Sequence, residues 1–307
     1  MYQQAGDVPC DWRAVVIGGL PGADKPGVLR AAGVDQSQYF TISVDRILRL
    51  MAARDLIPLI ARLTPMEAAD LAHVEAQFLA KRAGLRAMAD GRNLIWDISM
   101  ASLPATQALL DTLRLARYRV GALFAELTVE ESVRRADAAH RRGHEEYRAG
   151  RGFGGRFIPP EAIRALALPP LAGPTEAATG RASATAPVRP SAAGDAALDG
   201  RFLGSEVTGM IAAYGTGKIS LADLACCFRL RTWPAVPPAC PPEMRDAAPA
   251  LDDPEPYVPG SFDDVVLAYD LGKLSDDEYR ELAKAAAAAS RGKRSSTAEV
   301  TGPAYGA

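Results

Sequence analysis

The segment Gly19–Pro26 reads GLPGADKP and follows an apolar run, Arg13–Gly19. A phosphate-binding loop has the pattern G-x-x-x-x-G-K-[ST] between a strand and a helix. Its glycines let backbone N–H groups surround phosphate oxygens, its lysine neutralises phosphate charge, and its hydroxyl helps to hold magnesium. Gly19, Gly22 and Lys25 agree with this chemistry. The segment is therefore a candidate phosphate-binding loop.

Two residues of this segment depart from the pattern. Asp24 stands at the second motif glycine and adds a carboxylate beside the phosphates. Pro26 replaces the Ser/Thr and has neither a hydroxyl nor a backbone N–H. The same residues are compatible with a plain glycine-rich turn between a strand and a helix, with Pro26 in the first helical turn. Both interpretations stay open at this point.

Two acids follow strand-like runs and could serve phosphoryl transfer. Asp45 comes after Tyr39–Val44 (YFTISV), and Asp97 lies at the end of the apolar run in Asn93–Ile98 (NLIWDI). A carboxylate near a phosphoryl group can accept a proton from an attacking hydroxyl, and another can organise magnesium. Alternatively, Asp45 caps a helix that starts near Arg46, and Asp97 is itself a helix N-cap.

An arginine-rich stretch spans Arg134–Arg156. Arginines on a lid can clamp phosphates and balance transition-state charge. The stretch could also be a solvated basic face, or a nucleic-acid patch, although its few aromatic residues argue against nucleic acid. His140 and His144 lie four residues apart without an evident third ligand, so we do not expect a metal site there.

These residues need a scaffold, and the first half of the chain alternates strand-like and helical patterns. Helices are expected over Pro65–Asp90, with Thr64 and Glu67 as a capping box, and over Leu103–Ala116 and Glu130–Arg142. Such alternation predicts an α/β fold with a parallel sheet. No fifth strand is visible after Ile163, so the sheet is shortened or Arg201–Val207 supplies its edge.

The remaining chain divides into segments of different composition. Residues 169–200 are rich in Ala and Pro and predict a disordered linker. AYGTGKIS (Ala213–Ser220) and AYDLGKLS (Ala268–Ser275) form a weak repeat, with glycine helix stops and serine caps. We expect two small helical hairpins, at 201–235 and 261–307, separated by a Pro/Asp-rich spacer at 236–260. Trp233 should be a packing anchor, and the tail after Ala289 should be frayed.

Composition restricts the function further. The net charge is −2, so no global charge draws the chain to nucleic acid or membrane. No apolar run could span a bilayer, and the N-terminus lacks the pattern of a signal peptide. The four cysteines show no CxxC spacing. We therefore expect a cytoplasmic protein with reduced thiols.

Several segments, in order, resemble actinobacterial members of the zeta-toxin family, whose members are kinases related to UDP-N-acetylglucosamine kinase and chloramphenicol phosphotransferase. The resemblance covers about half of the chain, and its segments around Asp97 and Arg156 are the most specific. The matching segments are GGLPGADK (Gly18–Lys25), TISVDRI (Thr41–Ile47), LTPMEAADLAHVEA (Leu63–Ala76), GRNLIWDISMAS (Gly91–Ser102) and HRRGHEEYRAGRGFGGRFIPPEAI (His140–Ile163).

The resemblance implies a parallel-sheet P-loop kinase-like domain over residues 1–168, using ATP and Mg²⁺. It implies a nucleotide sugar such as UDP-N-acetylglucosamine as acceptor, and an antitoxin or another protein as a possible partner. The implied roles are phosphate contact for Lys25, base for Asp45, magnesium for Asp97, substrate binding for Glu75 and Ser99, and charge stabilisation for Arg135 and Arg156. Gly19, Gly22, Asp24, Lys25 and Pro26 would line the nucleotide. The alternative is a P-loop pseudokinase that binds without turnover, as Asp24 and Pro26 suggest.

Overall fold

The computed structural model describes residues 8–167, 204–237 and 252–298 of the 307-residue chain. The described residues form two compact units. The first contains residues 8–167, 237 and 252–256, and the second contains residues 204–236 and 257–298. The expected linker at 169–200 lies outside the described residues. A short segment from the expected spacer therefore belongs to the first unit.

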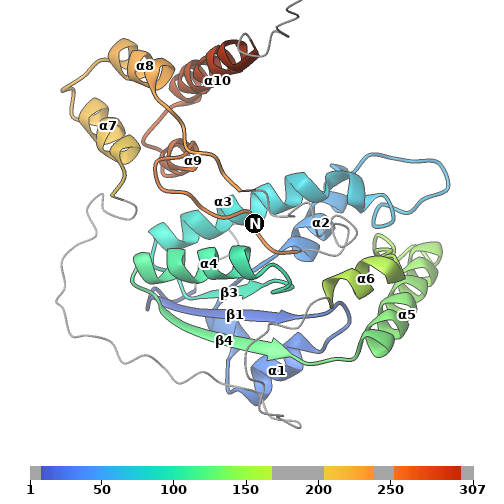
Figure 1. The fold of residues 1–307 in the computed structure, drawn as a ribbon. Helices are drawn as coiled ribbons and strands as arrows, with labels where there is room; N and C mark the ends of the chain where they lie inside the picture. Colours follow the sequence, from blue (N-terminus) through green and yellow to red (C-terminus); the bar gives the residue numbers. More distant parts are fainter. Residues whose placement is uncertain (1–7, 168–203, 238–251, 299–307) are drawn as a thin grey trace, which may run out of the picture. The chain divides into compact units, whose positions relative to one another are not determined.

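The first unit is built on a four-stranded sheet in the order β2-β3-β1-β4. Its strands are β1 (Arg13–Gly19), β2 (Phe40–Ser43), β3 (Leu94–Asp97) and β4 (Arg119–Ala125). All three strand pairs are parallel. Val16 of β1 pairs with Trp96 of β3 and with Ala122 of β4. The predicted α/β class with a parallel sheet is confirmed (Figure 1).

Helices cover both faces of the sheet. The helix α1 (Lys25–Ala31) lies on one face, and α3 (His73–Ala89) and α4 (Leu103–Leu115) lie on the other (Figure 1). The side chains of β1 alternate, so Val15 and Ile17 pack with Leu29 of α1 in one core cluster. On the other face, a Cβ on Gly84 of α3 would meet the Trp96 ring at 2.2 Å. Glycine there allows the helix to approach β3 closely.

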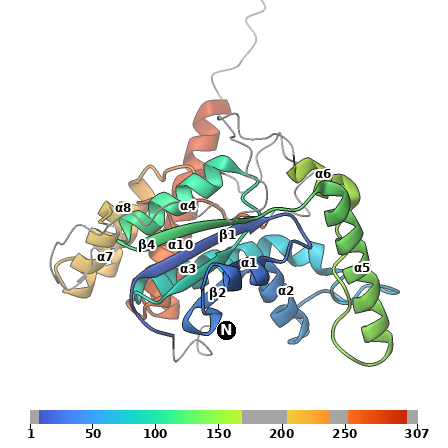
Figure 2. The same cartoon turned by 90° about the horizontal axis from the view of Figure 1, so that it is seen from below.

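The remaining helices of the first unit lie near the carboxyl ends of the strands. They are α2 (Val44–Ala52), α5 (Val129–Arg148) and α6 (Pro160–Leu166), with the short 3-10 turn η3 (Ala69–Ala72). The other 3-10 turn, η2 (Gln36–Gln38), directly precedes β2 at the amino end of that strand. β4 points toward α5, which stands beside this end of the sheet (Figure 2). This arrangement brings the loops that follow β1, β2 and β3 together with α5.

Three expectations about these elements are corrected. The segment Pro65–Asp90 is not one helix, because turns and η3 precede α3. Thr64 and Glu67 do make the reciprocal bonds of a capping box, but these close a turn instead of opening a helix. The helix expected over Glu130–Arg142 is α5, and it continues to Arg148. Of the candidate edge Arg201–Val207, residues 201–203 lie outside the described residues, 204–205 form no strand and α7 begins at Glu206, so its described part adds no edge to the sheet.

The second unit contains α7 (Glu206–Gly215), α8 (Leu221–Leu230), α9 (Asp263–Asp270) and α10 (Asp276–Ala298). The expected caps are present, since Ser220 and Asp223 form a full capping box at α8. The helix α10 extends through Ala298, and residues 299–307 of the expected tail lie outside the described residues. All four helices share one core, so the two predicted hairpins form a single helical unit. Its buried residues include Val207, Ile211, Leu224, Phe228, Val265 and Leu282.

Trp233 packs against this core as predicted. Its indole lies edge-on to Phe228 and Phe262, and its Nε1 donates to the Phe228 carbonyl at 3.2 Å.

Among the described residues, Cys10, Cys226 and Cys227 are free and exposed. A search of those same ranges finds no helix with the length and apolar character needed to cross a membrane.

Candidate functional site

A pocket of about 370 Å³ lies at the carboxyl ends of the parallel strands. Ligands of open α/β sheets bind at this edge, where loops leave the strands. The Gly19–Pro26 loop lines one side, and α2 and the residues after β3 line another. The wall formed by α5 and the loop after it includes Arg142, Gly143 and Arg156. The pocket thus gathers residues from the loop after β1, from α2, from the residues after β3, from α5 with its following loop, and from Asp252.

Glycine is required at two positions of the loop after β1. Gly19 has a φ of 142°, and a Cβ there would meet the Ala125 carbonyl oxygen at 2.6 Å. Gly22 has a φ of 78°, and its Cβ would meet the Cβ of Arg135 at 2.8 Å. The loop therefore runs close to β4 and α5. A strand, a tight loop and a helix follow one another here, as the sequence predicts.

The two departures from the phosphate-loop pattern both have structural roles. Asp24 is the N-cap of α1 and accepts a hydrogen bond from the Gly27 amide at 2.9 Å. Its φ is −76°, so this position does not demand glycine. Pro26 lies in the first turn of α1, where no intrahelical N–H is needed. Two loop amides, those of Ala23 and Lys25, donate to loop carbonyls.

Lys25 and Asp97 form the central ion pair of the pocket. The Lys25 ammonium donates to Asp97 Oδ1 and to the Ile98 carbonyl, each at 2.7 Å. Burial raises the pKa of Asp97 and outweighs the opposing effect of Lys25; the negative charges of Asp252 and Asp45 act in the same direction as burial. The N-cap of α4 is Ser102, so the interpretation of Asp97 as a helix cap is wrong.

Asp45 lies in the first turn of α2 and also lines the pocket. Its carboxylate accepts a hydrogen bond from Arg49 Nε at 2.9 Å, one turn further along the helix. The N-cap of α2 is Ser43, so Asp45 does not cap this helix. With about two fifths of its side chain exposed, at 39 %, Asp45 can be reached by a hydroxyl in the pocket.

Arg156 is placed by a run of close backbone contacts. A Cβ on Gly143 of α5 would meet the Gly155 amide at 2.5 Å, and one on Gly155 would meet the His140 carbonyl at 2.4 Å. A Cβ on Gly154 would meet Thr64 Oγ1 at 2.1 Å. Gly143 and Gly155 allow the loop after α5 to contact the helix closely, and Gly154 allows the same loop to contact Thr64. Arg156 at the end of this loop is therefore held at the pocket wall.

The Arg156 side chain is only 5 % exposed and contacts several polar groups. Its Nη1 lies 3.3 Å from Asp252 Oδ1, its Nε lies 3.5 Å from Asp70 Oδ1, and its Nη2 lies 3.1 Å from His73 Nδ1. Burial lowers the pKa of Arg156, but the carboxylates of Asp252, Asp70 and Asp45 outweigh it and raise the pKa above its ordinary value. The guanidinium is a fixed positive charge.

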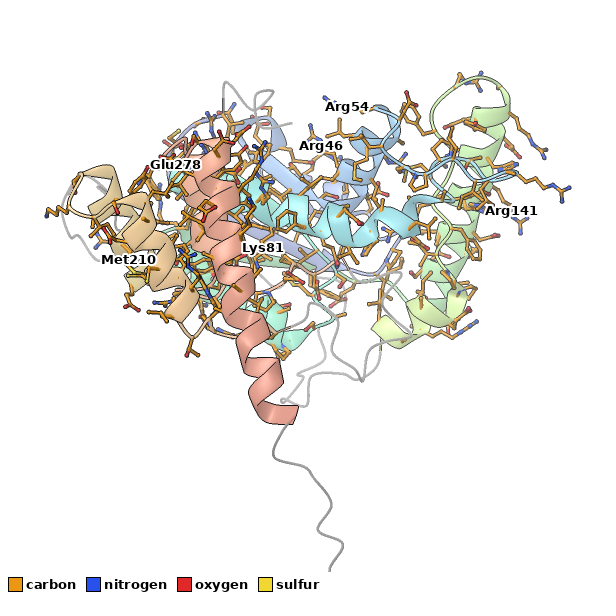
Figure 3. The ribbon with its side chains drawn as sticks, turned by 90° about the horizontal axis from the view of Figure 1, so that it is seen from above. Arg46, Arg54, Lys81, Arg141, Met210 and Glu278 are labelled. Carbon is orange, nitrogen blue, oxygen red and sulfur yellow. The ribbon has the colours of Figure 1, made fainter. Side chains whose placement is uncertain are left out.

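The other predicted site residues are arranged differently. Ser99 lines the pocket and donates its hydroxyl to Asp253 Oδ1 at 2.8 Å. Arg135 contacts the loop, with Nη1 lying 3.3 Å from the Gly22 carbonyl, and it pairs with Glu131. Glu75 is exposed in the first turn of α3 and does not line the pocket. Arg141, from the same arginine stretch, extends outward from α5 (Figure 3).

His140 and His144 both contact the carboxylate of Glu67. His140 Nε2 lies 2.9 Å from Glu67 Oε1, and His144 Nδ1 lies 3.4 Å from the same oxygen. Within the three described ranges, no group of three or more His, Cys, Asp or Glu side chains is arranged to hold a metal ion. These histidines join α5 to the turn that precedes α3.

Sequence reasoning missed the acids at 252 and 253. Asp252 lines the pocket, and Asp253 is fully buried among the residues after β3. Their run, Asp-Asp-Pro-Glu-Pro, lies in the expected spacer and has the composition of a solvated connector. No pattern in the sequence links this segment to the pocket, because only the tertiary structure brings it there.

Two comparisons with known proteins give different outcomes. A search of curated proteins finds no match to the chain. The family model described as zeta toxin matches residues 12–168, just over half of the 307-residue chain. The matched region contains the whole sheet, the loop after β1, both strand-end acids and the arginine-bearing wall of the pocket. The chain therefore belongs to the zeta toxin family, and its first unit carries that family's P-loop kinase-like domain.

Proposed function

We propose that the chain is an ATP-dependent kinase that phosphorylates a hydroxyl group of a nucleotide sugar such as UDP-N-acetylglucosamine. The observation that carries this proposal is the convergence of Lys25, Asp45, Asp97 and Arg156 on one pocket. The tertiary structure brings together an acid exposed to the pocket, a lysine–acid pair and a fixed guanidinium. General-base and phosphate-stabilising chemistry needs these groups.

The pocket residues fit a magnesium–nucleotide in charge and donor type. Lys25, Arg49, Arg142 and Arg156 offer positive charge to phosphates. The Asp97 carboxylate is 32 % exposed and is a hard oxygen donor of the kind that Mg²⁺ prefers. Bound ATP would supply the γ-phosphoryl group. Lys25 would exchange its contact with Asp97 for phosphate oxygens and so release the carboxylate to organise magnesium.

In this proposal, Asp45 acts on the acceptor. As the acceptor hydroxyl oxygen forms its bond to phosphorus, Asp45 would take the hydroxyl proton, and the bond to the leaving ADP oxygen would break. Arg49 bonds to one oxygen of the Asp45 carboxylate and leaves the other oxygen for this proton. Arg142 and Arg156 would balance charge that spreads over the transferred group.

A second function, nucleotide binding without turnover, is supported by the loop itself. Pro26 supplies no hydroxyl for magnesium, and Asp24 adds negative charge beside the pocket. The amides of Ala23 and Lys25 donate within the loop instead of toward the pocket. These features favour a pseudokinase in which the fold serves recognition.

Titration calorimetry with ATP and Mg²⁺ tests the shared first step. We expect the wild-type chain to bind and Lys25→Ala to lose binding at least tenfold, because a lysine in a phosphate site acts as a point charge. Lys218→Ala is the matched control, since Lys218 lies between a glycine helix stop and a serine cap in the second unit and is exposed. Binding that is undetectable at millimolar ATP would exclude both functions.

Turnover then separates the two functions. The assay is ADP formation with UDP-N-acetylglucosamine as acceptor, for the wild type and for Asp45→Asn. A kinase should form ADP only with acceptor present and should lose at least a hundredfold in kcat in the variant. ATP binding without any acceptor-dependent ADP supports the pseudokinase.

A further inference from the structure

The segment Asp252–Pro256 belongs to the first compact unit although it lies far beyond the region of the family match. Asp253 is its main anchor and has 0 % of its surface exposed. Asp253 Oδ1 accepts hydrogen bonds from the Ser99 amide at 2.9 Å, the Ser99 hydroxyl at 2.8 Å and the Met100 amide at 2.8 Å. Asp253 Oδ2 accepts from the Ser102 amide at 2.8 Å.

These donors form a preformed anion-binding nest. Met100 has a φ of 57°, and this left-handed turn directs successive amides to the same side. Ser102 is the N-cap of the 13-residue helix α4, so the carboxylate also lies at the positive end of a helix dipole. The nest follows directly after Asp97 and Ile98 in the chain. It therefore joins the bound carboxylate to the loop that carries the Asp97–Lys25 pair.

Side chains of helix α3 bind the main chain of the same segment. The side-chain Nε2 of Gln77 donates to the Asp253 carbonyl at 3.3 Å, and the Lys81 ammonium donates to the Pro256 carbonyl at 3.1 Å. Lys81, labelled in Figure 3, is 5 % exposed and lies 3.9 Å from the Glu255 carboxylate. The segment is thus recognised at its acidic side chains and at its backbone, as a bound peptide is.

Asp252 extends this contact into the pocket. Its Oδ1 lies 3.3 Å from Arg156 Nη1, and Asp252 lines the pocket with Lys25 and Asp45. A guanidinium pairs with carboxylate and phosphate through the same N–H groups. A phosphate on Arg156 would therefore meet the negative charge of Asp252 and compete with it for the same donors.

We propose that residues 252–256 are an acidic peptide ligand built into the chain, bound by the nest at Ser99–Ser102 and by α3, and that its Asp252 competes with nucleotide phosphates for Arg156. The docking half of this proposal stands on the contacts alone. The competition half rests on the proposed nucleotide binding. The segment then sets how tightly the pocket holds a phosphate.

Hydrogen exchange of the full chain tests the docking. Asp253→Asn replaces one acceptor oxygen with a donor amide, so we expect the Ser99, Met100 and Ser102 amides to exchange at least tenfold faster. Asp277→Asn is the control, because Asp277 is exposed on α10 of the second unit. Ser99→Ala, which removes one donor to Asp253, provides a milder variant if Asp253→Asn fails to fold. Unchanged protection of these amides in folded variants overturns the docking.

Calorimetry with ATP and Mg²⁺ tests the competition. Asp252→Asn removes one negative charge beside the phosphates, and we expect roughly tenfold tighter binding than in the wild type. Equal or weaker binding in the variant overturns the competition and would show that Asp252 only holds Arg156 in place. If neither chain binds ATP, the proposed function and the competition fail together, while the exchange experiment still decides the docking.

Discussion

At the scale of single residues, the loop after β1 shows how a departure from a motif acquires a structural role. Asp24 replaces a motif glycine, yet its carboxylate caps α1 through the Gly27 amide. The same carboxylate is about two thirds exposed, and Asp24 does not itself line the pocket, as the resemblance implied, although its neighbours Ala23 and Lys25 do. One side chain therefore caps a helix and leaves a negative charge next to residues that line the pocket.

Substitution of Asp24 can separate these two effects. Asp24→Ala should lower the free energy of unfolding by about 1 kcal/mol because the cap is lost, whereas Asp24→Asn should change it by a few tenths because the side-chain oxygen remains. Both variants should bind ATP more tightly, since both remove the charge. Urea unfolding and calorimetry measure these quantities. Equal destabilisation by Asn and Ala would contradict the capping role.

At the scale of elements, α5 is joined to the turn before α3 through Glu67. The Glu67 carboxylate accepts from the Thr64 amide at 2.7 Å and contacts His140 and His144 of α5. Burial raises the pKa of Glu67, but hydrogen bonds from Thr64 and His140 and the charge of His144 outweigh it, so its pKa is lowered overall. The ionised carboxylate therefore stabilises the folded state.

This shift predicts a pH dependence with a defined sign. Because the folded pKa lies below the ordinary value of 4.5, the stabilisation is fully present above pH 4.5 and is lost as the pH falls through the folded pKa. Glu67→Gln should lower the free energy of unfolding by about 1 kcal/mol at pH 7. The difference from wild type should shrink at pH 3. Glu75→Gln, at an exposed position, is the control.

Urea unfolding at the two pH values measures both differences. A loss in Glu67→Gln that is the same at pH 3 and pH 7 would show that packing, and not the ionised carboxylate, holds α5 to the turn. The same result in Glu75→Gln as in Glu67→Gln would point to a general effect of removing one negative charge.

At the scale of the whole molecule, the chain contains two compact units with separate cores. In the second unit, Phe228 of α8 is fully buried and packs with residues from α7, α9 and α10. Small helical pairs rarely bury enough apolar surface to be stable alone. The shared core explains how the two repeated segments can be stable together.

Phe228→Ala should therefore weaken all four helices of this unit. We expect a loss of about 3–5 kcal/mol in its stability. Hydrogen exchange should accelerate in α9 and α10 as much as in α7 and α8. Leu230→Ala on the same helix is the matched control, because Leu230 is 82 % exposed. Faster exchange limited to α7 and α8 would indicate two independent hairpins.

The sequence by itself determined the parallel α/β fold, the strand–loop–helix at Gly19–Pro26 and the strand-end positions of Asp45 and Asp97. Each depends on local chemistry, namely apolar runs, glycines at positive φ and polar residues where strands end. The sequence also predicted helices at both repeats, because serine caps and glycine stops act within a few residues.

Only the tertiary structure decided the breaks in the helix predicted over 65–90, the joining of the two hairpins and the arrival of Asp252 and Asp253 at the pocket. A helix pattern cannot show that Thr64 packs against Gly154, which lies in a distant loop. The segment Asp252–Pro256 has the composition of a spacer, and its hydrogen-bond donors Ser99, Met100 and Lys81 lie about 150 or more residues away in the sequence. Contacts at that separation depend on how the whole chain packs, and no local pattern encodes them.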